Sequence, residues 1–322
     1  MFKTVRAAAV QDSPVFLDLE GSLEKAAGLV QEAASAGATL VVFPETWLPG
    51  YPVWANRLVL NRDHPQLKQL FSRLYANAIA VPSPETEKLA AVAKEAGVYL
   101  VLGVNEREAR FGRGTLYNSI LFFGPDGSLR GVHRKLMPTF HERTVWGWGD
   151  GSGLLVDDAE PGRIGGLICW EHWMPLARYA LYAQGEQVHA ALWPSLFARE
   201  SLHGEMVQTA SRFYAHEGRT FVVAACGYLE KSSLPPLAGL EEEMEKWPQV
   251  LLCGGSAILG PYGEYLAGPA FEGEGTIYAD LDLGRLVEAR HSLDVTGHYA
   301  RPDVFRLIVN RRRQDPMEEG PA

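Results

Sequence analysis

An uninterrupted apolar run, Leu40-Val41-Val42-Phe43, places the strongest constraint on how this chain folds. A strand that is apolar on both faces must be covered on both sides, which is typical of the sheets of α/β proteins. A short β-rich segment, Thr4 to Gln11, lies upstream, and apolar residues between Leu23 and Ala34 recur at helical spacing. The sequence therefore predicts strands that alternate with helices around a buried sheet.

Capping residues mark the boundaries of two predicted helices. Ser22 is the predicted N-cap of the first helix, and Gly37 ends it. The second helix is expected to begin with Ser83 as cap and Pro84 in its first turn, and to end at Gly97. A strand is expected to follow from Val98 to Val104.

Two predicted hairpins interrupt this alternation. Pro125-Asp126-Gly127 joins strands 116–123 and 129–135, and a similar unit at 256–263 contains the turn Gly260-Pro261-Tyr262-Gly263. Between the hairpins, strands at 164–169, 189–193 and 221–225 alternate with helices at 175–184 and 202–217. The whole pattern predicts one α/β domain over residues 1–310, with a surface insertion at 229–250 and a mobile tail at 311–322.

Charge and hydropathy exclude two classes of partner. The chain holds 30 Lys and Arg against 39 Asp and Glu, a net charge of −9 that repels phosphate backbones, so we expect no nucleic-acid partner. No stretch approaches the ~18 apolar residues of a membrane span, and the apolar run near the N-terminus is shorter than a signal-peptide core of about 7–15 residues. We therefore expect a cytoplasmic protein without membrane contact.

Three cysteines lie at 169, 226 and 253 without CxxC spacing, which argues against a disulfide framework and a zinc knuckle. Cys226 and Cys253 lie in apolar surroundings and are interpreted as small buried hydrophobes. Cys169 instead ends a strand and precedes Trp170-Glu171-His172-Trp173, at the strand edge where α/β proteins place their sites. A helix starting near Pro175 would direct its positive end at the sulfur and lower the thiol pKa, so Cys169 is a candidate nucleophile.

Two further charged residues end predicted strands. Glu45 closes the apolar run of residues 40–43, where burial would raise the pKa of its carboxyl toward that of a useful base. Lys135 ends the second strand of the first hairpin. No Ser-His-Asp pattern accompanies the three strand-end residues, so a serine-type triad is not indicated.

Three segments resemble the signature segments of the nitrilase superfamily of carbon–nitrogen hydrolases, in the order of that family. They are Phe43-Pro44-Glu45, His133-Arg134-Lys135-Leu136 and Cys169-Trp170-Glu171-His172. The resemblance extends to segments 48–52, 140–143, 254–256 and 297–305, and therefore spans nearly the whole chain. The residues after Cys169 and the Gly-His-Tyr-Ala-Arg-Pro-Asp segment are similar to the true nitrilase branch.

The resemblance implies a four-layer αββα sandwich and a Cys-Glu-Lys catalytic set. By that match Cys169 is the nucleophile, Glu45 the general base and Lys135 the cation that stabilises the tetrahedral species, while Glu142 matches a second family glutamate that positions the lysine or assists proton transfer. The implied reaction hydrolyses a nitrile to a carboxylic acid and ammonia through a covalent thioimidate and thioester. It requires no metal and no cofactor.

Seven of the eight tryptophans lie near the proposed site residues in the sequence, which predicts an aromatic-lined pocket and a preference for aromatic or arylaliphatic nitriles. The predicted substrate-binding residues are Trp170, Tyr51, Trp146, Trp193 and His172.

Four alternatives remain open from the sequence. The same residues could hydrolyse carboxamides or cyanide. A metal hydrolase using His133, His141 and His172 is disfavoured because their spacing matches no ligand pattern. A non-enzymatic assembly module would leave the Cys-Glu-Lys set without a use. The resemblance also implies a homodimer or a larger homo-oligomer, including spirals.

Overall fold

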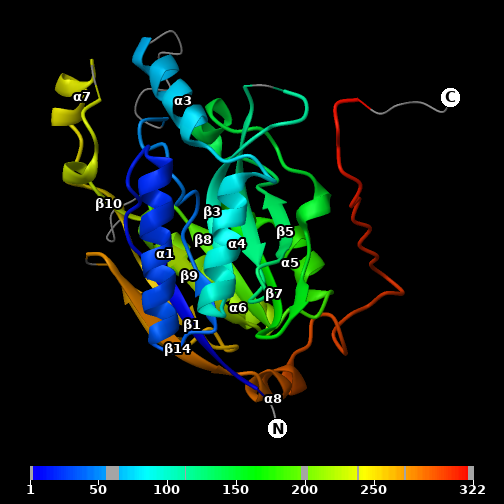
Figure 1. The fold of residues 1–322 in the computed structure, drawn as a ribbon. Helices are drawn as coiled ribbons and strands as arrows, with labels where there is room; N and C mark the ends of the chain where they lie inside the picture. Colours follow the sequence, from blue (N-terminus) through cyan, green and yellow to red (C-terminus); the bar gives the residue numbers. More distant parts are fainter. Residues whose placement is uncertain are drawn as a thin grey trace.

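Two facing β-sheets form the centre of the protein (Figure 1). The computed structural model describes residues 3–55, 65–112, 114–196, 202–237, 239–271 and 273–317. Within these residues each large sheet has six strands. The first sheet has the order β14-β1-β2-β3-β4-β5, with bounds β14 Gly275–Asp282, β1 Thr4–Gln11, β2 Leu40–Val42, β3 Tyr99–Arg107, β4 Leu116–Phe123 and β5 Leu129–Arg134. The second has the order β13-β12-β9-β8-β7-β6, with bounds β13 Tyr265–Ala270, β12 Ser256–Leu259, β9 Phe221–Cys226, β8 Val188–Trp193, β7 Gly162–Ile168 and β6 Asp157–Ala159.

Helices cover the outer face of each sheet, which gives the expected four-layer αββα sandwich. The first sheet is covered by α1 (Leu19–Ser35) and α4 (Pro84–Ala96), and the second by α5 (Pro175–Tyr182) and α6 (Leu202–Gly218). Alternate residues of β2 explain its apolar run: Val41 packs with α1 and α4, whereas Leu40 and Val42 belong to the cluster between the sheets. Strand β2 is therefore buried on both faces, as its sequence predicts.

The helix boundaries test the predicted caps. Helix α4 begins at a capping box made by Ser83 and Thr86, and Gly97 follows its end with a φ of 67°, which confirms the prediction. The prediction that Ser22 caps the first helix is wrong. Asp18 is the N-cap and accepts from Gly21 N at 3.1 Å, while Ser22 lies inside α1 and donates to the carbonyl oxygen of Val15. Aspartate is an equally strong cap and lies at the start of the apolar pattern.

The predicted strands and hairpins are present, with end shifts of up to three residues. One shift concerns the site, because Cys169 is not the last residue of its strand. It is the first residue of a 3₁₀ turn, η3 (Cys169–Trp173), that follows β7. Three further features have no predicted counterpart: α3 (Pro65–Asn77), α8 (Gly284–Ser292) and the antiparallel pairing of β14 with β1.

The segment at 229–250 is not a simple surface insertion. It contains α7 (Glu241–Glu245) and connects β10 (Tyr228–Glu230) to β11 (Val250–Cys253), which pair with each other. Leu237, Leu240 and Trp247 from this segment are buried in a third apolar cluster that also contains Trp54. Leu237, Leu240, Met244 and Trp247 recur at helical spacing, but Pro235-Pro236 and the run Glu241-Glu242-Glu243 made the segment look like an exposed loop.

The described part of the tail, residues 311–317, contacts the body of the protein. The backbone N–H of Gln314 donates to Asp150, and Asp315 pairs with Arg110 at 3.2 Å. The mobility of residues 311–322 stays a prediction.

Within the described residues, no helix is both long enough and apolar enough to cross a bilayer.

Candidate active site

The ends of three strands bring the predicted catalytic residues together. Glu45 follows β2 and Lys135 follows β5. Strands β2 and β3 are parallel, and two antiparallel steps lead from β3 through β4 to β5, so β2 and β5 end at the same edge of the first sheet. Cys169 follows β7 in the facing sheet, which contacts β4. The site therefore lies between the two sheets.

The backbone around this site is locally strained. Cys169, Thr46 and Phe140 have φ values of 52°, 43° and 46°, in the left-handed region that non-glycine residues rarely adopt. Each lies at a site segment: Cys169 itself, the residue after Glu45, and the second residue before Glu142. Such strain persists only where surrounding contacts hold it, and it clusters at functional sites. The turn of Glu45 also needs Gly103, because a Cβ there would lie 2.1 Å from the carbonyl oxygen of Pro44.

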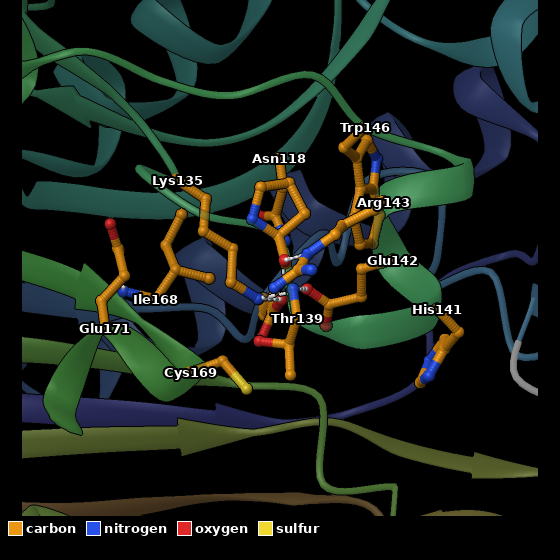
Figure 2. Close-up of polar contacts among 12 residues, drawn as sticks. Asn118, Lys135, Thr139, His141, Glu142, Arg143, Trp146, Ile168, Cys169 and Glu171 are labelled. Atoms are coloured by element: carbon orange, nitrogen blue, oxygen red, sulfur yellow. Dashed lines mark hydrogen bonds and ion pairs between the residues drawn. The ribbon is translucent and has the colours of Figure 1, made fainter. Parts of the chain in front are cut away.

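A buried ionic set forms the centre of the site (Figure 2). The Nζ of Lys135 lies 2.8 Å from Glu45 Oε1 and 2.7 Å from Glu142 Oε2. One carboxylate oxygen from each glutamate and the Sγ of Cys169 all lie within 4.8 Å of one another. In Figure 2 the Cys169 side chain lies below the cluster formed by Lys135, Thr139 and Glu142. The sulfur, the two carboxyls and the ammonium thus share one small space.

The two glutamates differ in how many of their oxygens are already bonded. Glu142 Oε1 accepts from the Tyr51 hydroxyl at 2.9 Å, and its Oε2 accepts from Lys135 and from the backbone N–H of Thr139. Glu45 Oε1 accepts from Asn118 at 2.6 Å and from Lys135. Glu45 Oε2 is buried and has no hydrogen-bond partner among the residues that the structure describes. Glu45 therefore has a free basic oxygen, and Glu142 has its oxygens occupied.

Burial sets the proton affinities of the site. It raises the pKa of Glu45 to about 7, assisted by the charge of Glu142 and opposed by Lys135. Burial also raises the pKa of the Cys169 thiol well above its usual value, opposed by the charge of Lys135 and assisted by those of Glu45 and Glu142. For Lys135 burial opposes the charge, but Glu142 and Glu45 keep its pKa well above the ordinary range. The resting state is therefore a neutral thiol beside a lysine cation.

The expected lowering of the thiol pKa by a helix N-terminus is wrong. Helix α5 begins at Pro175, six residues beyond Cys169 and after the whole of η3. A macrodipole acts mainly within the first turn of a helix, so burial dominates.

Glu171 connects the backbone beside Lys135 to the backbone beside Cys169, a role that was not predicted from the sequence. Its buried carboxylate accepts from Leu136 N at 2.8 Å, from Ile168 N at 2.7 Å and from the ring of His133. Leu136 and Ile168 are the neighbours of Lys135 and Cys169, so Glu171 joins the two sheets where the lysine and the sulfur must meet. These contacts lower the pKa of Glu171 despite its burial. The only sequence signal was a carboxylate two residues after the cysteine.

Asn118 is the second missed residue. It lies on β4 between β3 and β5, and its amide holds the bonded oxygen of Glu45 in place. In sequence it is one of two adjacent polar residues, Asn118 and Ser119, in an otherwise largely apolar strand, and nothing there indicates which charged group it contacts.

A cavity of about 360 Å³ opens over the sulfur. It is lined by Thr139, Phe140, His141, Glu142, Cys169, Trp170, Trp193, Pro194, Ser195, Leu196, Met206 and Val207. Of the five predicted substrate-binding residues, Trp170 and Trp193 therefore reach the cavity. Tyr51, Trp146 and His172 do not line it, because each is buried behind the wall.

The three buried residues contact the site from behind. Tyr51 bonds Glu142, and Trp146 packs edge-on against Tyr51 and donates to Asn105 at 2.9 Å. His172 stacks on Trp193 with ring centroids 4.6 Å apart. Their contacts support side chains of the site.

The structure also separates the three histidines of the metal alternative. His133 bonds Glu171, His172 bonds the carbonyl oxygen of Cys169, and His141 lines the cavity. Within the described chain, the side chains spaced to hold an ion are Glu45, Glu142 and Cys169. The ammonium of Lys135 already contacts both carboxylates, so a divalent ion would lie beside a fixed positive charge. This geometry suits an ammonium better than a metal.

Known proteins resemble the chain over nearly its whole length. The family model described as carbon–nitrogen hydrolase matches residues 6–291. An aliphatic nitrilase from Sinorhizobium fredii is 45% identical over 306 residues, which cover 95% of each chain. A bifunctional nitrilase/nitrile hydratase from Oryza sativa subsp. japonica is 45% identical and covers 98% of this chain and 86% of its own. Nitrilase 2 of Arabidopsis thaliana is 42% identical, with coverages of 97% and 91%.

Solved structures share the fold. A carbon–nitrogen hydrolase from Helicobacter pylori aligns with a TM-score of 0.71 at 22% identity, over 94% of this chain and 97% of its own. Nit3 of Saccharomyces cerevisiae, from the nitrilase superfamily, aligns with a TM-score of 0.72 at 22% identity, over 92% and 97%. The chain therefore belongs to the carbon–nitrogen hydrolase family, the nitrilase superfamily, and is a hydrolase that acts on carbon–nitrogen bonds.

Proposed function

We propose that this protein is a nitrilase that converts a nitrile into a carboxylic acid and ammonia, with Cys169 as nucleophile and Glu45 as general base. The observation that carries the proposal is the free buried oxygen of Glu45, on a carboxyl that lies within 4.8 Å of the Cys169 sulfur. A neutral thiol needs a base before it can attack, and this carboxyl has the pKa of about 7 that a base working at neutral pH requires. The curated relatives named nitrilase support the choice of substrate.

In the first step Glu45 takes the thiol proton while the Cys169 sulfur attacks the nitrile carbon. Glu45 then passes this proton to the nitrogen, which regenerates its carboxylate and gives a thioimidate, R–C(=NH)–S–Cys169. Lys135 is held by two carboxylates at the point where negative charge develops, so its ammonium stabilises that charge. Glu142 keeps the lysine in position because its oxygens are already bonded to Tyr51, Thr139 and Lys135.

In the second step water, activated by Glu45, adds to the thioimidate and forms a tetrahedral carbon bearing OH, NH₂ and sulfur. Loss of ammonia leaves a thioester, R–C(=O)–S–Cys169. A second water then cleaves the thioester, releases the carboxylic acid and returns the proton to the thiol. The four reacting side chains already lie together in one buried space, so their orientation before the reaction contributes to the rate.

We assign Trp170 and Trp193 to the substrate and give Tyr51, Trp146 and His172 a positioning role, since they lie behind the cavity wall. The cavity volume of about 360 Å³ is at the small end of ligand sites. Aromatic rings and the aliphatic side chains of Leu196 and Val207 line it, which supports an arylaliphatic or aromatic nitrile. Leu176 and Phe213 are exposed on the outer helices, which supports a homo-oligomer. We also propose that the enzyme is cytoplasmic.

A panel of nitriles and their matching amides tests the proposed function. We expect ammonia and acid from phenylacetonitrile-like compounds, with slower turnover of short aliphatic nitriles and much slower turnover of the amides. Ammonia release and chromatography measure these rates. Fast amide turnover without nitrile turnover would make the protein an amidase, and activity on cyanide alone would make it a cyanide dihydratase. A preference for short aliphatic nitriles would contradict the aromatic pocket.

The same tetrahedral carbon can expel sulfur instead of ammonia and release an amide. Several curated relatives carry the name bifunctional nitrilase/nitrile hydratase, which favours this second product. The chromatography of the panel experiment detects it directly as amide formed together with the acid.

The base role of Glu45 predicts an acid limb in the pH profile. Only the ionised carboxylate accepts the thiol proton, so kcat should rise about tenfold per pH unit below pH 7, and this rise should end near pH 7. Glu45→Gln should lose the limb and about 10²- to 10⁴-fold in kcat. Asn118→Leu removes a hydrogen bond that lowers the pKa of Glu45, so its limb should move to higher pH. An unchanged limb in Glu45→Gln would assign the titration to another group.

A further inference from the structure

A chain of buried hydrogen bonds leads away from the nucleophile on the side opposite the cavity. His172 Nδ1 lies 2.7 Å from the carbonyl oxygen of Cys169, and His172 Nε2 lies 3.0 Å from His189 Nε2. His189 Nδ1 lies 2.8 Å from Glu186 Oε1, and the Tyr214 hydroxyl donates to Glu186 Oε2 at 2.6 Å. Glu186, His189 and His172, which we call the relay, are at most 1% exposed and do not line the cavity. The reaction proposed above does not use them.

The order of donors and acceptors in the relay is fixed by its two ends. A carbonyl oxygen only accepts, so His172 must hold its proton on Nδ1 and accept at Nε2. His189 must then donate from Nε2. The remaining contact between His189 Nδ1 and Glu186 needs one more proton, either on the carboxyl or on the imidazole. All three contacts are therefore satisfied only when the relay holds one proton beyond two neutral histidines and a carboxylate.

Loss of that proton leaves one contact without a hydrogen. A Glu186 carboxylate can only accept, so the single proton of neutral His189 moves to Nδ1 and donates to Glu186, which turns the Nε2 of His189 into an acceptor. This acceptor is strengthened by the carboxylate behind it, so it draws a proton onto Nε2 of His172. The Nδ1 of His172 is then bare and faces the Cys169 carbonyl oxygen, and the hydrogen bond of 2.7 Å becomes a contact between two acceptors.

We propose that the relay is a positioning device for the nucleophile, which anchors the Cys169 carbonyl only while Glu186, His189 and His172 share this proton. The sulfur is presented from a turn whose φ of 52° must be held by its contacts. Release of the carbonyl lets that turn relax, and attack geometry is sensitive to shifts of this kind. Turnover should therefore fall when the relay loses its proton at alkaline pH. The assignment rests on the proposed function only in taking Cys169 as the nucleophile.

The packing around Glu186 supports an exchangeable proton there. A Cβ on Gly165 of β7 would lie 2.3 Å from Glu186 Oε1, so the glycine makes room for the carboxyl. Arg290 of α8 donates to the backbone oxygen of Glu186 at 2.6 Å and not to its carboxyl. Burial raises the pKa of Glu186 to about 8, opposed by Tyr214 and Arg290, and burial together with His189 lowers the pKa of His172 to about 3.

Other charged or titratable groups also face the relay. Glu171 of η3 and His133 of β5 lie near His189. Arg178 of α5 donates to the His172 carbonyl oxygen at 2.9 Å and to Glu217. Tyr182 donates to the carbonyl oxygen of Tyr214. Arg178 is paired with Glu217, and Arg290 acts on the carboxyl of Glu186 through its charge and not through a hydrogen bond.

The test combines variants with a pH profile of kcat. In the unaltered protein we expect kcat to fall about tenfold between about pH 7 and pH 9.5, as one anchoring hydrogen bond is lost. Glu186→Gln keeps the shape and supplies a permanent N–H donor to His189, so it should stay active and lack the alkaline fall. Tyr214→Phe removes a donor that favours the carboxylate, so its fall should move to higher pH. Tyr182→Phe removes a neighbouring phenol outside the relay and should leave the fall unchanged.

Histidine ¹⁵N NMR reads the relay without any substrate. Signals of His172 and His189 are assigned by their loss in His172→Gln and His189→Gln. We expect His172 to carry its proton on Nδ1 at pH 6.5 and on Nε2 at pH 9.5, and to stay on Nδ1 throughout in Glu186→Gln. A tautomer of His172 that does not change with pH, or an alkaline fall that survives in Glu186→Gln, would overturn the relay. A tautomer switch in a protein without nitrile turnover would refute the proposed function alone.

Discussion

Cys169→Ala should lose at least about 10⁴-fold in kcat while its fold and its free energy of unfolding stay within about 1 kcal/mol of the unaltered protein. The nucleophile has no substitute, because each later step proceeds through a bond to this sulfur. The side chain is small and the carbonyl of residue 169, not its sulfur, carries the contact with His172. Ammonia release measures turnover, and circular dichroism with thermal unfolding measures the fold.

Cys226→Ala is the matched control for this experiment. Cys226 is fully buried on β9, and burial raises the pKa of its thiol far above the usual value, so it should be inert toward alkylation. This variant should keep its turnover and its inactivation by iodoacetamide. Residual turnover in Cys169→Ala close to that of the control would remove the covalent mechanism.

Lys135→Met should lose both activity and stability. The ammonium is completely buried between Glu45 and Glu142, and methionine leaves two carboxyls facing each other without a counter-charge. Removing one partner of a buried ion pair costs about 3–5 kcal/mol. We expect a loss of this size in the free energy of unfolding at pH 8, measured by urea denaturation, and kcat lower by about 10³-fold or more.

The stability loss of Lys135→Met should depend on pH, and the pKa of Glu45 gives the direction of this dependence. Lys135 lowers the pKa of Glu45, so its removal raises that pKa further above the unfolded value. A carboxyl whose pKa is raised in the folded state contributes fully to the free energy of unfolding at low pH, and this contribution is lost as the pH rises through that pKa. The deficit of Lys135→Met should therefore be small near pH 5 and largest above pH 8.

A neutral variant separates the two losses. Lys135→Met combined with Glu45→Gln and Glu142→Gln has no buried charge at this position, and such replacements are often neutral for stability. It should recover most of the free energy of unfolding and none of the turnover. A Lys135→Met protein as stable as the unaltered one at pH 8 would show that the three groups do not meet in solution.

Much of the framework of the site could be predicted from local patterns. The apolar run 40–43 predicts a strand buried on both faces, and a charged residue directly after such a strand must lie at its end. The same reasoning applies to Lys135 and Cys169, and the resemblance of their segments to the nitrilase superfamily indicates the four-layer fold. These inferences succeed because strand alternation, capping and turn chemistry depend on neighbours in the sequence.

The predictions failed where partners are distant in sequence. Ser22 and Asp18 are both good caps, and only the packing of α1 selects between them. Tyr51, Trp146 and His172 lie near site residues along the chain, and only the fold shows that they do not line the cavity. The thiol pKa is raised rather than lowered because the burial of Cys169 outweighs the dipole of a helix that starts too far away.

The amino-acid sequence by itself determined which chemical groups this protein has and that they lie at strand ends. Only the tertiary structure decided which carboxyl has a free oxygen, that Glu171 fastens Leu136 to Ile168, and that Glu186 and two histidines lie behind the nucleophile. The physical reason is that proton affinity depends on burial and on hydrogen-bond partners. In this protein those partners come from strands and helices that are far apart along the chain and meet only when the two sheets pack together.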